Sequence, residues 1–255
     1  MITDSVNKRD LIEGLMKGLE VLNCFDAATP QTTASQVAQR LNISRAAARR
    51  FLITLAHTGY LESDGRYYKP TPKVLNLSNA YIGSSNLPKA VTPFLQRLTR
   101  ELQFSSNCAV LEGLEAVYVA RVNATRIMST GFEPGTRLPA YTSSAGRVML
   151  AALDDYYLND WIERVRLFQF TEHTPTDKAT LLMQLHAIRE RQFEMTESLF
   201  EVGLRGIAVP LRNRNGDVLA AISVTMAASV CTSEEALKTC LPPLQKAAAE
   251  LMGTL

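Results

Sequence analysis

The sequence predicts an α+β protein with three parts: an N-terminal winged helix-turn-helix, a linker helix and a C-terminal mixed α/β domain. Residues 33–58 read as two amphipathic helices joined by a very tight turn, and a β-hairpin signal follows at 59–69. Beyond residue 100, short β-type runs, then helices, then further β-type runs follow one another. That order is typical of a mixed domain and argues against a doubly wound nucleotide-binding fold.

Length and composition are those of an ordinary globular protein. The chain has 255 residues, 46% of them hydrophobic and 20% charged, with a formal net charge of +2. This excludes a polybasic nucleic-acid binder, although the small positive excess lies in residues 1–70. The four cysteines show no metal-ligand spacing, and the sequence has neither a signal-peptide core nor an apolar run of the roughly 20 residues needed to cross a bilayer. We expect a reduced, cytoplasmic protein without membrane contact, metal or cofactor.

The first elements are a tail and a helix. Residues 1–10 are polar and predict a disordered or partner-contacting tail, and residues 12–25 predict the first helix of the winged domain. Leu15, Leu19 and Leu22 follow the i, i+4, i+7 spacing of one apolar face.

The helix pair carries its own start signals. Thr33 and Gln36 form a capping-box pattern, and Ser44 is placed to cap the second helix. The apolar stripe of that second helix leaves Arg45, Arg49 and Arg50 on its other faces. No acidic residue occurs between positions 27 and 61. A helix-turn-helix entering a major groove fits this pattern, and on these residues alone a pair of ordinary helices with a solvated arginine face fits equally well.

The hairpin signal favours DNA binding. Apolar and aromatic residues flank Ser63-Asp-Gly65, which predicts a wing directly after the second helix. Arg66 and Lys69 would then meet phosphate beside the groove, and we predict that Arg49 is the main base reader. The predicted DNA-binding residues are Thr33, Ser35, Ser44, Arg45, Ala46, Arg49, Arg50, Thr54, Arg66 and Lys69.

A linker helix and a larger domain follow. Thr71 and Pro72 predict a helix start, and the apolar side of residues 74–82 would contact a second subunit or pack on its own winged domain. The predicted parts are therefore a tail (1–10), a winged domain (11–71), a linker helix (72–86) and the C-terminal domain (87–255). In the last of these we expect helices at 88–102, 147–153, 155–165, 176–192 and 233–251, and strands at 107–111, 116–121, 126–130, 203–209 and 218–225.

Catalytic and nucleotide-binding motifs are missing from the C-terminal domain. It has no G-x-S-x-G, G-x-G-x-x-G, P-loop or H-E-x-x-H pattern, and the three histidines form no ligand pair. We therefore expect no enzyme activity.

Two stretches could build a small-molecule pocket. Residues 141–146 form a small-residue loop that opens a helix, where free amides hold carboxylates well. Ser223 and Thr225 share one face of an apolar strand. The purely structural interpretations, helix capping and edge-of-sheet alternation, are favoured on these residues alone.

In this order of parts, the chain resembles the IclR family of bacterial transcription regulators. The resemblance is carried by Gly18-Leu-Glu-Val-Leu22, the helix pair with Leu61, Leu138-Pro139, Ser144-Ala-Gly-Arg-Val-Met-Leu-Ala151, Gly203-Leu-Arg-Gly-Ile-Ala-Val-Pro210 and Asn215-Gly-Asp-Val-Leu-Ala-Ala-Ile-Ser-Val224. Residues 45–50, 118–123 and 129–135 are similar to the subgroup that governs protocatechuate and 4-hydroxybenzoate catabolism.

The resemblance implies a homodimer or homotetramer that binds double-stranded operator DNA through its winged domains. A small organic acid would bind the C-terminal, GAF-like domain, and RNA polymerase is a possible partner at the promoter. The implied effector contacts are Ile127 or Met128, Ser144, Ala145, Thr196, Gly206, Ser223 and Thr225. Ser143 and Gly146, from the small-residue loop that opens the helix, complete the predicted effector site.

Two departures from the family pattern point to the effector. Thr196 stands where many members have an acidic residue, and Gly206 where they have cysteine. A roomier, less acidic pocket fits a small aromatic carboxylate, 4-hydroxybenzoate or protocatechuate, better than glyoxylate. We therefore expect a ligand-responsive regulator of aromatic-acid catabolism, activator or repressor according to operator position. The alternative is a small-molecule enzyme with an accessory DNA-binding domain, which turnover of an aromatic acid would reveal.

Overall fold

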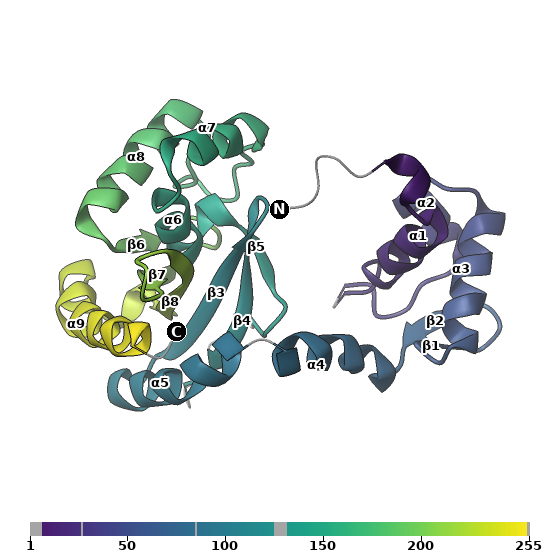
Figure 1. Cartoon of the computed structure of the whole chain (residues 1–255), viewed down its shortest axis with the longest axis horizontal. Coiled ribbons are helices and arrows are strands. Elements are labelled where there is room, and N and C mark those ends of the chain that lie inside the picture. Colours follow the sequence, from purple (N-terminus) through teal and green to yellow (C-terminus); the bar gives the residue numbers. More distant parts are fainter. Residues whose placement is uncertain (1–6, 27, 85, 125–131, 254–255) are drawn as a thin grey trace. The chain divides into compact units, whose positions relative to one another are not determined.

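The computed structural model describes residues 7–26, 28–84, 86–124 and 132–253. Contacts divide the chain into two compact units, Met1–Ser84 and Ser85–Leu255, and each is described by itself (Figure 1). The α+β fold class and the order of the helix-turn-helix and the sheet domain are as the sequence predicts.

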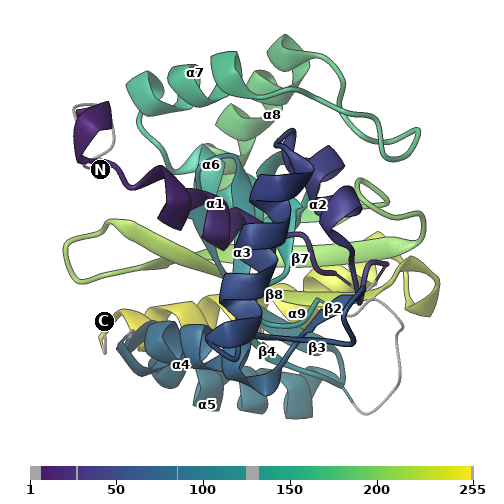
Figure 2. The same ribbon diagram turned by 90° about the vertical axis from the view of Figure 1, so that its right-hand side faces the viewer.

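The N-terminal unit is a winged helix-turn-helix. A short 3-10 turn η1 (Lys8–Asp10) precedes α1 (Glu13–Leu22), α2 (Ala34–Leu41) and α3 (Arg45–His57), and the hairpin of β1 (Leu61–Ser63) and β2 (Tyr68–Pro70) is the wing. In Figure 2, α1 and α2 flank α3, which packs on both. The core of this unit centres on Val21, Val37, Ala48, Leu52 and Leu61.

The tight turn between α2 and α3 rests on the expected caps. The Thr33 hydroxyl accepts the Gln36 N–H while the Gln36 side chain accepts the Thr33 N–H, which completes the capping box. Asn42 ends α2 in the left-handed conformation, with φ of 52°. Ser44 Oγ then accepts the N–H of Ala47 and starts α3.

The apolar face predicted for the first helix reaches the core only in part. Leu15 and Leu19 are 61% and 50% exposed, and the side chains that reach the core are Val21 and Cys24. Only the C-terminal end of α1 and the turn after it supply fully buried side chains. Leu22, the third leucine of the series, packs against this core, whereas Leu15 and Leu19 are left open to solvent.

The linker starts as expected at Thr71, whose hydroxyl accepts the N–H of Lys73. Pro72 opens a 3-10 turn η2 (Pro72–Val74), which runs into α4 (Leu75–Ser84). Leu75, Leu77 and Tyr81 are exposed, so packing on the winged domain, one of the two expected arrangements, does not bury these side chains.

Among the described residues, the C-terminal unit contains a six-stranded antiparallel sheet of order β5-β4-β3-β8-β7-β6. Its strands are β3 (Ser105–Glu112), β4 (Glu115–Val122), β5 (Arg137–Pro139), β6 (Glu194–Glu197), β7 (Leu204–Arg212) and β8 (Val218–Ala227). The short β5 and β6 were not predicted, and the expected strand at 126–130 lies outside the described residues.

Helices cover both faces of this sheet (Figure 1). On one face lie α5 (Asn86–Leu102) and α9 (Ser233–Met252), and on the other α6 (Ser144–Ala151), α7 (Asp155–Arg164) and α8 (Lys178–Arg191). Two further 3-10 turns, η3 (Ala140–Thr142) and η4 (Ala228–Val230), precede α6 and α9. Side chains alternate along β8, so that Ala221 packs beneath α6 whereas Ile222 packs in the core with α5 and α9.

No helix within the described parts of the chain combines the length and the apolar character needed to cross a membrane.

Candidate functional site

The outer face of α3 is basic. Arg45, Arg49 and Arg50 are exposed, whereas Ala48 and Leu52 on the opposite side are fully buried. Thr54, also exposed, donates its hydroxyl to the Arg50 carbonyl. In the described part of the chain no ion pair engages these three arginines, so their charges face solvent at the N-terminal half of the helix.

The other predicted DNA contacts surround this face. Ser35 and Ala46 are exposed, and Thr33 and Ser44 are used as helix caps. In the wing, the Arg66 guanidinium lies 5.3 Å from the Tyr67 ring centre. Lys69 Nζ lies 2.8 Å from a carboxylate oxygen of Glu62, and this ion pair raises the pKa of Lys69. A phosphate contact at Lys69 therefore exchanges one anionic partner for another.

A pocket lies where the start of α6 meets strands β6, β7 and β8. Its volume in this conformation is about 20 Å³, which is room for about one water molecule. All its lining side chains are uncharged: Tyr118, Phe132, Leu138, Thr142, Ser143, Ser144, Thr196, Leu199, Phe200, Leu204, Gly206 and Thr225. A larger ligand must displace some of these side chains, and Phe132, Leu199 and Phe200 are the bulky ones not anchored in a strand or helix.

The sheet forms the floor of this pocket. Thr196, Gly206 and Thr225 are cross-strand neighbours on β6, β7 and β8. A Cβ atom added at Gly206 would lie 2.7 Å from the Ser144 hydroxyl and 3.5 Å from the Thr196 hydroxyl. The structure thus brings together Ser144, Thr196, Gly206 and Thr225, four residues that the family resemblance implies as effector contacts.

Other implied contacts lie elsewhere. Ser223 faces the same side of β8, beside Asn107 and Ala208 and one step from the pocket lining, and it is buried. The next residue back along β8, Ile222, belongs to the core on the opposite face of the sheet. Ile127 and Met128 lie outside the described residues.

The start of α6 is capped and tightly packed. Ser143 Oγ accepts the N–H of Gly146 at 3.1 Å, so Ser143 caps the helix and the Gly146 amide is already hydrogen-bonded within the protein. A Cβ atom at Gly146 would lie 2.2 Å from the Ala140 carbonyl oxygen, so close backbone packing explains this glycine. Ala145 is buried in the core. The amides of Ser144 and Ala145 belong to the first turn, where a helix supplies no carbonyl partner.

Sequence reasoning missed an aromatic cluster at the pocket. The Tyr118 and Phe132 rings stack with centroids 5.4 Å apart, and Phe200 meets Phe132 edge-on at 6.3 Å. Burial raises the pKa of Tyr118 to about 12, so its hydroxyl keeps its proton. No local pattern signals the cluster, because its members come from β4 and two loops far apart in the chain.

A buried ion pair lies beside the pocket, in α6 and β6. Arg147 Nε donates to Glu194 Oε1 at 2.9 Å, and another guanidinium nitrogen donates to Gln184 at 2.7 Å. Arg191 pairs with the second Glu194 oxygen. Burial lowers the pKa of Arg147 to about 10, which leaves it protonated at neutral pH. Arg147 is thus fully engaged within the protein.

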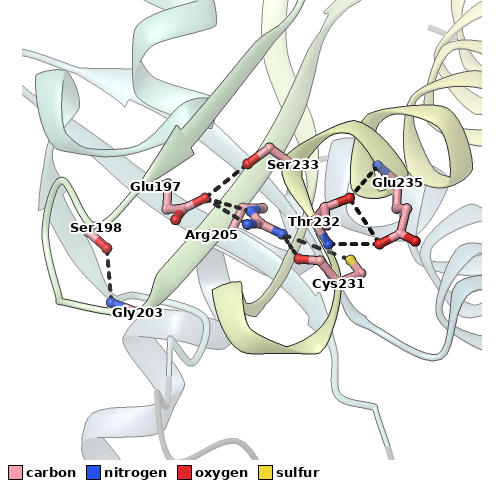
Figure 3. A network of polar contacts seen from close by, with 8 residues as sticks. All are labelled: Glu197, Ser198, Gly203, Arg205, Cys231, Thr232, Ser233 and Glu235. Atoms are coloured by element: carbon pink, nitrogen blue, oxygen red, sulfur yellow. Dashed lines mark hydrogen bonds and ion pairs between the residues drawn. The ribbon is translucent and has the colours of Figure 1, made fainter.

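A polar network ties the strand ends beside the pocket to the start of α9 (Figure 3). Arg205 donates to one Glu197 oxygen from Nε and from a terminal nitrogen, at 2.9 and 2.7 Å, and donates to the Cys231 carbonyl at 2.6 Å. Ser233 donates its hydroxyl to the same Glu197 oxygen. Since Glu197 and Arg205 directly adjoin Thr196 and Gly206, this network fixes the edge of the pocket floor.

Among the residues that the structure describes, no cluster of three His, Cys, Asp or Glu side chains could hold a metal ion.

Comparison with protein families matches both units. The IclR helix-turn-helix domain matches residues 14–65, and the C-terminal domain of the bacterial transcriptional regulator IclR matches residues 79–252.

Individual relatives are similar over almost the whole chain. A Pca regulon regulatory protein of Pseudomonas putida is 37% identical over 96% of this chain and 85% of its own. The p-hydroxybenzoate hydroxylase transcriptional activator of Acinetobacter baylyi is 35% identical, covering 98% of this chain and 94% of its own. Among solved structures, a double mutant of the PobR inducer-binding domain from Acinetobacter, in complex with 3-hydroxybenzoic acid, is 31% identical. It aligns with a TM-score of 0.64 over 67% of this chain and 100% of its own.

Proposed function

Because the chain belongs to the IclR family of bacterial transcriptional regulators, we propose that its effector is a small aromatic carboxylate, 4-hydroxybenzoate or protocatechuate. The family and the named relatives are regulators, so the chain is a DNA-binding regulator of aromatic catabolism and not an enzyme. The names of those relatives refer to Pca and p-hydroxybenzoate functions, and these support the aromatic effector here.

One observation carries the proposal: Ser144, Thr196, Gly206 and Thr225 line one pocket together with Tyr118, Phe132 and Phe200. Aromatic rings pack well against a ligand ring. The effector carboxylate would bind the first-turn amides of Ser144 and Ala145, because a carboxylate costs several kcal/mol to desolvate unless donors replace its water. The helix dipole adds about 0.3–1 kcal/mol.

Operator recognition is assigned to α3 and the wing. Arg45 and Arg49 would enter the major groove, with Arg49 reading a base, and Arg66 and Lys69 would contact phosphate. One winged domain reads too few base pairs to select one genomic site, so we propose a homodimer or homotetramer on a palindromic operator, in the cytoplasm. RNA polymerase would be its partner at the promoter.

Effector titration tests the proposal. Calorimetry with 4-hydroxybenzoate, protocatechuate and their amides should show binding of the acids only. Equal binding of the amides would remove the carboxylate as the anchor. Footprinting of the neighbouring promoter, with and without the acids, should show protection of a palindrome that depends on the bound acid. Turnover of either acid by the pure protein would contradict a purely regulatory role.

A further inference from the structure

A series of three hydrogen-bonded side chains ends at the lining of the pocket. An Arg121 guanidinium nitrogen donates to Asn107 Oδ1 at 3.1 Å, and Asn107 Nδ2 lies 3.0 Å from Thr225 Oγ1. Arg121, Asn107 and Thr225 come from three adjacent strands, β4, β3 and β8. Of the three, Thr225 lines the pocket.

The chemistry of arginine determines which group donates and which accepts in each of these hydrogen bonds. A guanidinium has only donors, so Asn107 must turn its carbonyl oxygen to Arg121 and its amide nitrogen to Thr225. The Thr225 oxygen therefore accepts, and its own hydrogen is directed to another acceptor. The described part of the chain supplies no such acceptor for the Thr225 hydroxyl.

Burial holds the arrangement in place. Asn107 is fully buried, and Thr225 is 7% exposed. Arg121 is half-buried, and the loss of solvent lowers the pKa of its guanidinium. That guanidinium also lies 6.0 Å from the ring centre of Phe132, which lines the pocket. Reversing the Asn107 amide would bring two donors together at Arg121, so the hydroxyl keeps its role as donor.

We propose that Thr225 is a fixed hydrogen-bond donor that recognises the para oxygen of the effector, with Asn107 and Arg121 as its positioning residues. This inference rests on the proposed aromatic effector and adds which protein group recognises the end of the ligand opposite the carboxylate. With the carboxylate at Ser144, above Gly206 of β7, the para position lies over the neighbouring strand β8, where Thr225 is the direct cross-strand partner of Gly206. Adjacent strands are about 5 Å apart, which is of the same order as the distance between the carboxylate and the para oxygen of a benzoate that lies across the strands.

The wild-type protein provides the first test, by calorimetry. 4-Hydroxybenzoate and 4-methylbenzoate have nearly the same shape, but only the first can accept a hydrogen bond at the para position. We expect 4-hydroxybenzoate to bind at least about tenfold more tightly, since the methyl group leaves the buried Thr225 donor unsatisfied. Equal affinity would overturn the proposal.

Two isosteric variants test the direction of the hydrogen bonds that run from Arg121 through Asn107 to Thr225. Thr225→Val should abolish the preference for the hydroxyl over the methyl ligand and leave benzoate affinity within about twofold. Asn107→Asp presents acceptors to both neighbours, so Thr225 must donate to it and can only accept from the ligand. The ratio of 4-hydroxybenzoate to 4-aminobenzoate affinity should then fall by at least about tenfold, because the aniline is chiefly a donor.

Thr99→Val is the matched control, since Thr99 is also a buried, hydrogen-bonded threonine but lies on α5 at the other face of the sheet. Its ligand preferences should equal those of the wild type. If Thr225→Val weakens benzoate as much as 4-hydroxybenzoate, the hydroxyl recognises the carboxylate and the proposal is overturned. If the wild type binds no aromatic acid at all, the proposed effector class itself fails. Should a variant not fold, the wild-type comparison of the two para substituents decides.

Discussion

Gly146 at the start of α6 and Gly206 in the pocket floor lack a side chain for different reasons. Gly146 is required by packing, because a methyl group would collide with the Ala140 backbone, whereas at Gly206 it would meet the Ser144 hydroxyl, which can rotate. We expect Gly146→Ala to destabilise the protein by about 1–3 kcal/mol or more through overpacking. Gly206→Ala should change the melting temperature little but weaken effector binding at least about tenfold. Thermal unfolding and calorimetry on both variants separate the two roles, and equal stability losses would contradict this assignment.

The Arg147–Glu194 pair is a second prediction at the residue scale. Arg147→Met removes the main partner of a buried carboxylate, which costs about 3–5 kcal/mol when a buried pair is broken. Arg147→Met combined with Glu194→Met should recover most of that loss, because no buried charge is left uncompensated and the exposed Arg191 is solvated by water. Urea unfolding measures both, with Arg164→Met, from an exposed pair with Asp160, as a control expected to cost less than about 1 kcal/mol. A double variant as unstable as the sum of its parts would refute the explanation.

At the scale of elements, the proposed roles of α3 and the wing in DNA binding differ: α3 reads bases and the wing contacts phosphate. A bidentate arginine–guanine contact gives roughly 1–3 kcal/mol of discrimination between bases. Arg49→Ala should therefore reduce the ratio of operator to random-sequence affinity, while Lys69→Ala should weaken all sequences alike and flatten the salt dependence. Binding titrations at several salt concentrations check both, with Arg164→Ala in the other unit as control. An unchanged specificity ratio for Arg49→Ala would remove it from base recognition.

The network joining β6, β7 and α9 predicts a pH dependence. Hydrogen bonds from Arg205 hold the pKa of Glu197 below its ordinary value of 4.5. A carboxyl whose pKa is lower in the folded state stabilises the fold above the unfolded pKa, and this contribution is lost as the pH falls through the folded value. The melting temperature of Glu197→Gln should thus fall less steeply below about pH 4.5 than that of the wild type. The exposed Glu201→Gln should follow the wild type, and parallel curves for all three proteins would exclude a role for Glu197.

The elements that the sequence predicts best are those with local signals. Each helix cap, at Thr33, Ser44 and Thr71, and the wing turn depend on residues only a few positions apart in the sequence. By contrast, β5 and β6 are only three and four residues long and gain their hydrogen bonds from distant strands. The pocket shows the same division. Ser144 and Thr225 lie in recognisable stretches, while Phe132, Phe200 and the Asn107–Arg121 contact depend on tertiary packing that no local spacing records.

For the whole molecule, the main unexplained feature is apolar surface in the N-terminal unit. Leu11, Ile12, Leu15, Met16 and Leu19 are all exposed on or beside α1, and Leu75, Leu77 and Tyr81 are exposed on α4. Monomeric proteins rarely leave contiguous apolar patches of this kind uncovered. Since the proposed palindromic operator would also require two recognition helices, we expect a second copy of the chain to cover this surface.

The oligomer can be tested by placing charge on that surface. In the double variant Leu15→Glu and Leu19→Glu, two carboxylates would lose water if the subunits met there, and each such loss costs several kcal/mol. We expect the mass in solution to fall by half, whether the wild type is a dimer or a tetramer, and affinity for the full palindrome to fall toward that for a half-site. Ultracentrifugation and DNA titration measure the two effects. Met183→Glu, at an equally exposed apolar residue of α8, should leave both unchanged. A Leu15→Glu, Leu19→Glu protein of undiminished mass that still prefers the palindrome would show that the subunits associate through another surface.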